Sequence, residues 1–245
     1  MRRAAAFALP ALLLAGCAAA SQAPAQTNAL TIENRYPLEY AKQFTVDVCA
    51  GGYDLITIDG SRYLVVPEGA AAPANLDADI TVLQQPIRNI YLVSSSAMDP
   101  IISIGGLGAV ALSGTQAENW YLDAARTAME QGEITYAGKY SAPDYETILS
   151  ADCGLAIENT MIYHTPEVKE QLEKFGVPVL VERSSYESDP LARMEWVKLY
   201  GILLGRTEEA ERIFDDAVQR IAPLLDEEPT GKTAAFFSIT SNNLA

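Results

Sequence analysis

The chain of 245 residues has few of the side chains that most often carry catalysis or bind metal. It contains one histidine, His164, which excludes a metal cluster or a catalytic triad that needs a second histidine. It also lacks a CxxC pair, a P-loop, a GxGxxG turn and the Gly-x-Ser-x-Gly turn of a nucleophilic serine. A triad through His164 stays formally open, but its position beside a helix start favours a loop or capping role. The sequence therefore predicts no enzyme, no cofactor and no resident metal.

Cysteine is also scarce, with Cys17, Cys49 and Cys153 as the three examples. Cys17 belongs to the N-terminal segment described below. The other two could form a disulfide in an oxidising compartment, but the sequence does not give their distance. Two separate buried thiols are the favoured interpretation, and the disulfide remains open.

Positive charge is low, because 17 Lys and Arg face 32 Asp and Glu, a formal net charge of −15. Such an acidic surface repels phosphate backbones and anionic lipid headgroups. Nucleic acid is therefore excluded as a partner. Beyond the first residues, the sequence has no apolar run long enough to span a bilayer.

The N-terminus carries an export pattern. Arg2 and Arg3 precede an apolar run over 4–15, followed by Gly16 and Cys17. The last four of these residues (LAGC) resemble a bacterial lipobox, in which the peptide is cut before the cysteine and the thiol receives a lipid. We expect a signal peptide over 1–16, lipidation of Cys17 and a flexible tether over 17–29 that is rich in Ala, Ser, Gln and Pro. The chain would then be extracytoplasmic and anchored to a bacterial membrane; an ordinary signal peptide is the alternative.

After the tether, the pattern predicts a small β-hairpin region over 44–66. Residues 44–48, 55–58 and 62–66 alternate or are β-branched, and Gly51-Gly52 and Asp59-Gly60 mark the turns between them.

From Ile90 onward, short apolar runs alternate with amphipathic segments, which predicts an α/β lobe with a Rossmann-like parallel sheet. The predicted strands are 90–93, 109–112, 154–157 and 177–181. Five helices are predicted between these strands and after them. The first starts at Asp99-Pro100, the second spans 118–130, and the third opens with a capping box at Ser141 and Asp144. The last two span 166–176 and 190–205. A long amphipathic helix over 208–225 follows, and 232–239 reads as a new buried strand.

Ligands of open parallel sheets bind beyond the carboxyl ends of the strands. That rule selects the loops 94–99, 113–116, 158–164 and 182–187, together with the turn at 138–141. Tyrosines with a few cations suit a bulky, partly anionic organic ligand. The candidate ligand-binding residues are Ser95, Ser96, Tyr136, Lys139, Tyr140, Tyr163, Arg183 and Tyr186.

These features together resemble the substrate-binding proteins of ABC importers for iron-siderophores, haem and cobalamin. Residues 136–150 (YAGKYSAPDYETILS) are similar to a family core in which a glycine precedes an acid-x-Glu-x-Ile pattern. Residues 162–181 are similar to a second family unit, which contains Leu-Gly-Ile-Pro-Val where this chain has Phe-Gly-Val-Pro-Val at 175–179. Residues 36–40, 85–92 and 184–187 resemble a lipoprotein subgroup with an extra N-terminal hairpin. The resemblance covers about 34–239 as an ordered set of features.

The resemblance implies two α/β lobes joined by one long helix, with the ligand between them. Residues 30–206 would be the N-terminal lobe, 207–228 the inter-lobe helix, and 232–245 the start of a second lobe that is cut short in a fragment or a damaged gene product. The ligand would be a ferric siderophore or a similar metal chelate such as haem or a corrinoid; the sequence does not distinguish these. The partner would be an ABC permease with its ATPase, which Glu146 would contact. The alternative is a surface lipoprotein that is a small hydrolase or a scaffold.

Overall fold

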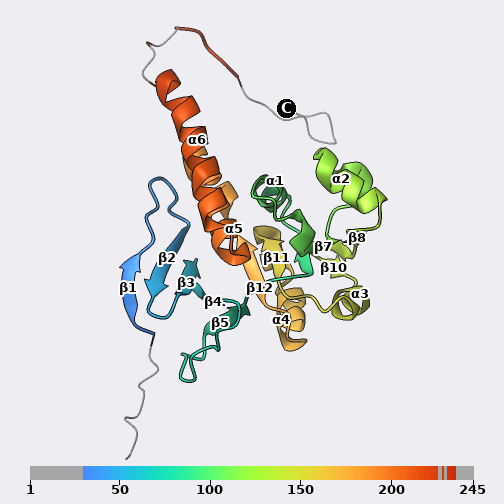
Figure 1. Cartoon of the computed structure of the whole chain (residues 1–245). Coiled ribbons are helices and arrows are strands. Elements are labelled where there is room, and N and C mark those ends of the chain that lie inside the picture. Colours follow the sequence, from blue (N-terminus) through green and yellow to red (C-terminus); the bar gives the residue numbers. More distant parts are fainter. Residues whose placement is uncertain (1–29, 226–227, 229–230, 236–245) are drawn as a thin grey trace, which may run out of the picture.

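The computed structural model describes residues 30–225, 228 and 231–235, which form two five-stranded sheets with helices around the second (Figure 1). Cys17, the predicted signal peptide over 1–16 and the predicted tether over 17–29 lie outside these residues. Within the described part of the chain, no helix combines the length and apolar character needed to cross a bilayer.

The N-terminal sheet is larger than the predicted hairpin. The three predicted strands are confirmed, but two further strands extend the sheet at its edges. Across the sheet the strands are β1 (Ile32–Arg35), β2 (Phe44–Cys49), β3 (Tyr53–Ile58), β4 (Ser61–Val66) and β5 (Ile80–Gln84). Strands β1 to β4 are antiparallel, and β5 is parallel to β4. All four residues of β1 are exposed, so this strand carries no hydrophobic alternation that a sequence pattern could reveal.

The second sheet is parallel, as predicted. Its strands are β6 (Ile90–Leu92), β7 (Val110–Ser113), β8 (Thr135–Tyr136), β11 (Ala156–Asn159) and β12 (Val179–Glu182), in the spatial order β12-β11-β6-β7-β8. The chain starts at the central strand β6, extends the sheet to one side through β7 and β8, and then returns to build the other side. This order confirms the Rossmann-like α/β fold class. A two-stranded hairpin, β9 (Gly138–Lys139) and β10 (Ala142–Pro143), follows β8.

Six α-helices and five 3-10 turns complete the described structure. The helices are α1 (Met98–Ser103), α2 (Asp123–Glu130), α3 (Tyr145–Ser150), α4 (Pro166–Lys174), α5 (Pro190–Leu204) and α6 (Thr207–Leu225). The turns are η1 (Ser95–Ala97), η2 (Leu107–Ala109), η3 (Ala117–Asn119), η4 (Thr160–His164) and η5 (Ser184–Tyr186). Figure 1 shows α6 projecting well beyond the sheets.

Two predicted helix starts were wrong. Helix α1 begins at Met98, because η1 leads directly into it, so Asp99 lies in the first turn and does not cap the helix. The expected helix over 118–130 is divided into η3 and α2, because the backbone is extended at Trp120 and Leu122. The buried Trp120 donates its indole N–H to Ser113 Oγ at 3.2 Å and so fixes the loop after β7.

Two further expectations also need correction. The predicted capping box starting at Ser141 is absent: Asp144 itself caps α3 and accepts the backbone N–H of Thr147 at 3.1 Å. Ser141 lies between β9 and β10. At the other end of the chain, residues 231–235 form no strand, and the rest of the predicted strand over 232–239 lies outside the described residues.

The parallel sheet packs a separate apolar core on each face. One core joins β6, β7, β11 and β12 to α1, α2, α5 and α6, and also includes the inner face of the N-terminal sheet. The other core lies under α3, α4 and η4. Since side chains alternate along a strand, neighbouring residues such as Ala156 and Ile157 belong to opposite cores.

Buried carboxylates attach the N-terminal segment to α5. Glu195 is fully buried; its two oxygens accept the backbone N–H groups of Glu39, Tyr40 and Ala41 at 2.8–3.1 Å and pair with Lys198 Nζ at 2.8 Å. Glu187 accepts the next two backbone N–H groups in the same way, at 2.9–3.1 Å. The segment 39–43 thus satisfies five N–H groups through two acidic side chains, which fixes the N-terminal sheet against the parallel sheet.

Candidate functional site

The strand order places a topological switch point between β6 and β11. From β6 the chain moves to β7 on one side, and β11 lies on the other side. The loops that leave these two strands therefore diverge at the carboxyl edge of the sheet, which is where open parallel sheets bind ligands. We define the candidate edge as η1 after β6, η4 after β11 and η5 after β12.

Five of the predicted binding residues lie on this candidate edge. Ser95 and Ser96 are exposed in η1, Tyr163 is exposed in η4, and Tyr186 is exposed in η5. The hydroxyl of Tyr186 lies 3.4 Å from Thr160 Oγ1, which joins η5 to η4. The edge thus combines hydroxyl groups with exposed aromatic rings.

Arg183, the fifth of these residues, already has partners within the molecule. Its Nη1 pairs with Asp59 Oδ2 at 2.7 Å, its Nε donates to Gln43 Oε1 at 3.3 Å, and its guanidinium lies 4.7 Å from the ring centre of Tyr186. Asp59 belongs to the turn between β3 and β4, so the N-terminal sheet reaches the candidate edge. The Arg183 side chain is only 16 % exposed, and its charge is balanced by Asp59 before any ligand arrives.

The remaining three predicted residues form a second group, at β8 and β9. Tyr136 and Lys139 are exposed, whereas Tyr140 packs partly against the core under α3. Only glycine fits at position 138 of this tight hairpin. Its φ is +84°, and a Cβ atom there would lie 2.3 Å from the carbonyl oxygen of Ala142. The structure therefore divides the predicted binding residues between two groups on opposite sides of the central strand.

Sequence reasoning did not select two buried acids, Glu158 and Glu182, as site residues. Each follows an apolar run near the end of a parallel strand, and both are almost fully buried. Glu182 accepts hydrogen bonds from Ser94 Oγ at 3.0 Å, Ser96 Oγ at 2.8 Å and the backbone N–H of Ser184 at 2.7 Å. The only sequence signal was an acid at the end of a strand that is otherwise apolar.

Glu158 has the opposite environment. Neither carboxyl oxygen has a hydrogen-bond partner in the described structure, and the side chain is completely buried. Burial in apolar surroundings raises the pKa of Glu158 from 4.5 to about 8, because the charged form loses its hydration. The residue, two residues before η4 begins, is therefore expected to be a neutral acid at pH 7.

Glu146, the expected permease contact, is exposed in the first turn of α3. Because α3 leads from the carboxyl edge back to the start of β11, its first turn lies nearest that edge. Glu146 lines a groove of about 430 Å³ together with Glu133, Thr135 and Thr147, and with Ala111, Leu112, Ser150 and Ala151. A carboxylate in this position is accessible to a basic group on another protein.

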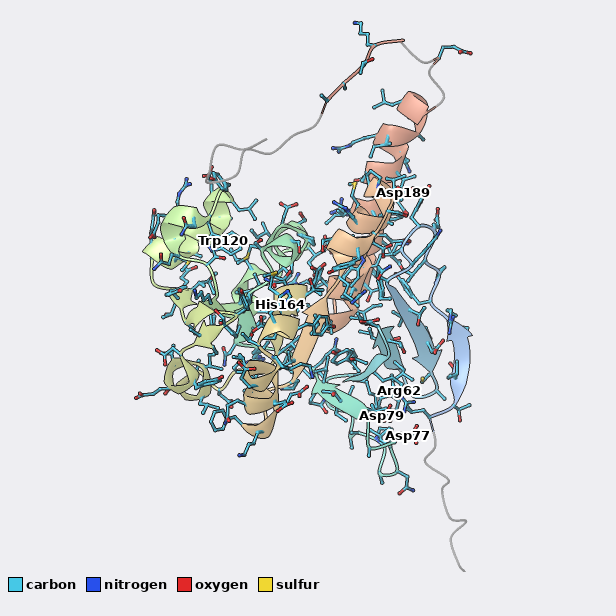
Figure 2. The ribbon with its side chains drawn as sticks, turned by 180° about the vertical axis from the view of Figure 1, so that it is seen from behind. Arg62, Asp77, Asp79, Trp120, His164 and Asp189 are labelled. Atoms are coloured by element: carbon cyan, nitrogen blue, oxygen red, sulfur yellow. The ribbon has the colours of Figure 1, made fainter. Side chains whose placement is uncertain are left out.

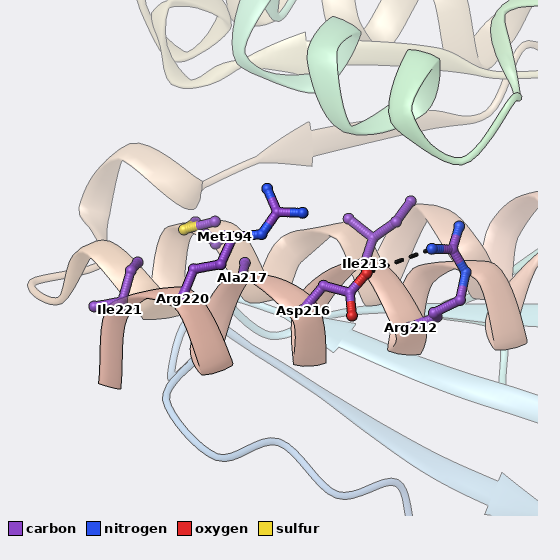
Figure 3. A pocket seen from close by; sticks show the side chains of 7 residues that line it. All are labelled: Met194, Arg212, Ile213, Asp216, Ala217, Arg220 and Ile221. Carbon is purple, nitrogen blue, oxygen red and sulfur yellow. Dashed lines mark ion pairs between the residues drawn. The ribbon is translucent and has the colours of Figure 1, made fainter. Parts of the chain in front are cut away.

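Another groove, also of about 430 Å³, lies between α5 and α6 (Figure 3). Met194 of α5 and the apolar residues Ile213, Ala217 and Ile221 of α6 line it. Arg212 pairs across one helical turn with Asp216 at 3.5 Å. None of the predicted binding residues lines this groove.

His164 lies at the end of the candidate edge, whereas Cys49, Cys153 and Arg62 lie outside it. His164 is exposed at the end of η4, immediately before α4, in keeping with a loop role (Figure 2). Cys49 and Cys153 are both free and buried, which confirms the favoured interpretation of two separate thiols. Arg62, Asp77 and Asp79 meet at the far end of the N-terminal sheet, where Arg62 contacts both acids at 2.9 Å (Figure 2).

Comparison with known sequences gives one distant relative. No model of a known protein family matches the chain. An uncharacterised lipoprotein of Methanocaldococcus jannaschii is 21% identical over 174 residues, which cover 65% of this chain and 41% of that protein.

Comparison with solved structures gives partial similarities to periplasmic binding proteins. A periplasmic haem-binding protein of Pseudomonas aeruginosa has a TM-score of 0.45 and 22% identity, over 57% of this chain and 46% of its own. The haem-binding protein HutB of Vibrio cholerae has a TM-score of 0.46 and 16% identity, over 58% and 51%. A Staphylococcus epidermidis protein described as a possible iron-binding (periplasmic solute-binding) protein has a TM-score of 0.45 and 16% identity, over 60% and 53%. The chain thus spans about half the length of the proteins it matches.

Proposed function

We propose that this chain is the N-terminal, ligand-binding lobe of an extracytoplasmic substrate-binding lipoprotein of an ABC importer. It would capture a ferric siderophore or a similar metal chelate at the candidate edge and deliver it to a membrane permease. Helix α6 would lead towards a second lobe. The observation that carries the proposal is the switch point between β6 and β11, where exposed hydroxyl and tyrosine side chains of η1, η4 and η5 gather.

Two features support this assignment. The sequence resemblance to iron-siderophore-type binding proteins covers 162–181 and 184–187, which include part of η4 and all of η5, and 136–150, which includes β9 and β10. The edge itself offers aromatic faces and hydroxyl groups, which suit a large organic chelate. The chain has a net charge of −15, and Lys139, exposed on β9 in the second group of predicted residues, is the cation that would contact an anionic part of the chelate.

Direct binding tests the proposal. A full-length protein, in which the coding region is extended to any in-frame second lobe, is mixed with haemin, cyanocobalamin, a ferric tris-catecholate or a ferric tris-hydroxamate. A chelate at about 100 times its Kd is expected to increase the free energy of unfolding by about 2.7 kcal/mol, which a thermal shift detects. Binding is also expected to quench tryptophan fluorescence. The absence of a shift and of quenching with all four compounds would refute the proposal.

Glu146 is expected to act on delivery and not on capture. Glu146→Ala is expected to leave the Kd of the bound chelate within about two-fold, because the residue lies outside η1, η4 and η5, and to reduce uptake about ten-fold, as for a lost charge-assisted contact. Uptake is measured in cells that carry the permease and its ATPase. Glu170→Ala on α4 is the matched control, since Glu170 is equally exposed but not on the groove. Equal uptake by both variants would exclude the docking role.

A further inference from the structure

The loop after β6 is held by a small buried network centred on Glu182. Glu182 is 2% exposed, and its Oε2 lies 3.0 Å from Ser94 Oγ and 2.8 Å from Ser96 Oγ, while the two serine oxygens are 2.9 Å apart. These three oxygens form a triangle. The other carboxylate oxygen accepts the backbone N–H of Ser184 at 2.7 Å. One side chain of β12 therefore organises both η1 and η5.

The chemistry of the triangle fixes where the hydroxyl hydrogens point. An ionised carboxylate is an acceptor only, so each serine must be the donor in its contact with Glu182. The alternative acceptor for either hydroxyl hydrogen is the other serine oxygen, which is also inside the triangle. In every arrangement that satisfies the network, the hydrogen of Ser96 points inward. The side of Ser96 Oγ that faces solvent then presents lone pairs alone.

We propose that Glu182 is a positioning residue that makes the candidate edge accept hydrogen bonds at Ser96 and so select chelates that carry hydrogen-bond donors there. Suitable donors are hydroxyl groups, amide N–H groups and protonated amines on the periphery of the chelate. This inference rests on the proposed function, because it assumes that a ligand reaches η1. It adds one determinant of specificity, namely that Ser96 Oγ accepts a hydrogen bond from the ligand and does not donate one.

Glu182→Gln tests this polarity with little change in shape. Glutamine replaces one acceptor oxygen by an NH₂ donor, which can donate to a serine oxygen and release a hydroxyl hydrogen towards solvent. The variant is expected to bind the tightest of the four compounds named above about ten-fold more weakly, as for one lost hydrogen bond to a charged network. Glu182→Asp, which retains the acceptor charge, is expected to recover part of the affinity.

A double-mutant cycle separates positioning from a general structural role. Ser96→Ala removes the hydroxyl, so the effect of Glu182→Gln on the Kd is expected to fall to less than about three-fold in the Ser96→Ala background. Ser95→Ala is the matched control, because Ser95 is exposed on the same turn, and there the full ten-fold effect is expected.

The outcomes distinguish this inference from the proposed function. If the unmodified protein binds none of the four compounds, the proposed function fails, and the proposed polarity falls with it. If the unmodified protein binds but Glu182→Gln has the same effect with and without the Ser96 hydroxyl, only the role of Glu182 is overturned. The role of Glu182 is supported if Glu182→Gln no longer changes the Kd in the Ser96→Ala background but still changes it in the Ser95→Ala background.

Discussion

Glu195→Ala is expected to lower the free energy of unfolding by about 3–5 kcal/mol at pH 7, the range measured when one partner of a buried ion pair is removed. Lys198, whose side chain is only 7% exposed, would lose its partner at 2.8 Å. The N–H groups of Glu39, Tyr40 and Ala41 would lose their acceptor at the same time. The folded variant would contain an unpaired buried cation and unpaired backbone N–H groups, and each of these lowers the free energy of unfolding.

The effect should depend on pH with a defined sign. Burial alone would raise the pKa of Glu195, but the N–H donors and Lys198 outweigh it and lower the pKa below its usual value. A lowered pKa means that the native state holds the carboxylate more strongly than the unfolded state does. The stabilisation is therefore complete above the usual glutamate pKa and is lost as the pH falls through the lowered value.

Chemical denaturation of the unmodified protein and of Glu195→Ala between pH 3 and pH 7 measures the difference in their free energies of unfolding. Glu209→Ala is the control, since Glu209 is half exposed and lies 3.5 Å from Arg212 on the surface of α6, where an ion pair contributes little. We expect that variant to change the free energy of unfolding by no more than about 0.5 kcal/mol. A loss below about 1 kcal/mol for Glu195→Ala would show that solvent or another group replaces the carboxylate.

The alternation of strands and helices could be predicted because it is encoded locally. Buried parallel strands are short apolar runs, and the helix ends carry their own signals. Asp189, for example, accepts the N–H of Leu191 at 2.8 Å at the start of α5, and Gly205 ends the helix with a φ of +65°. Where the local signal was ambiguous, as at Asp99 and Ser141, the neighbouring turn decided the helix start and the prediction failed.

The order of strands is not encoded locally, and neither is the partner of a polar side chain. Asp59 lies 124 residues before Arg183 in the sequence, yet the two pair at 2.7 Å and neutralise a cation that the sequence offered to a ligand. Glu158, Glu182 and the solvated glutamates have the same side chain, and only the three-dimensional packing distinguishes them. The carboxyl edge could thus be located from the sequence, but the charges available on it could not.

The stability of this protein is expected to fall as the pH rises from about 4.5 to about 8, because of Glu158. Its pKa is raised in the folded state to about 8 from 4.5, so over this interval the native state keeps a proton that the unfolded state has released. Each pH unit then removes up to about 1.4 kcal/mol, and below 4.5 or above about 8 the contribution is constant. Glu158→Gln removes the titrating group while it retains the shape, and at pH 7.5 we expect it to increase the free energy of unfolding by about 2–4 kcal/mol.

The groups around Glu158 keep this prediction simple. Tyr91 on β6 and Tyr145 on α3 face it, and burial raises the pKa of both phenols above their usual value of 10, so they stay neutral throughout the interval. Burial likewise raises the pKa of the Cys153 thiol. The negative charge of Glu167 on α4 also raises the pKa of Tyr145. Among these neighbours, the carboxyl of Glu158 is the group expected to change its charge inside the core.

Urea denaturation at half-unit intervals from pH 4.5 to pH 8.5 compares the two proteins, with Glu130→Gln on the exposed face of α2 as the matched control. The difference between Glu158→Gln and the unmodified protein should grow with pH and level off near pH 8, while the control stays parallel to the unmodified protein. Parallel curves for all three would mean that Glu158 is hydrated and ionised in the folded state. Because Glu158 lies two residues before η4, its ionisation inside the core at alkaline pH would weaken the support of the candidate edge, and chelate binding should then decline over the same interval.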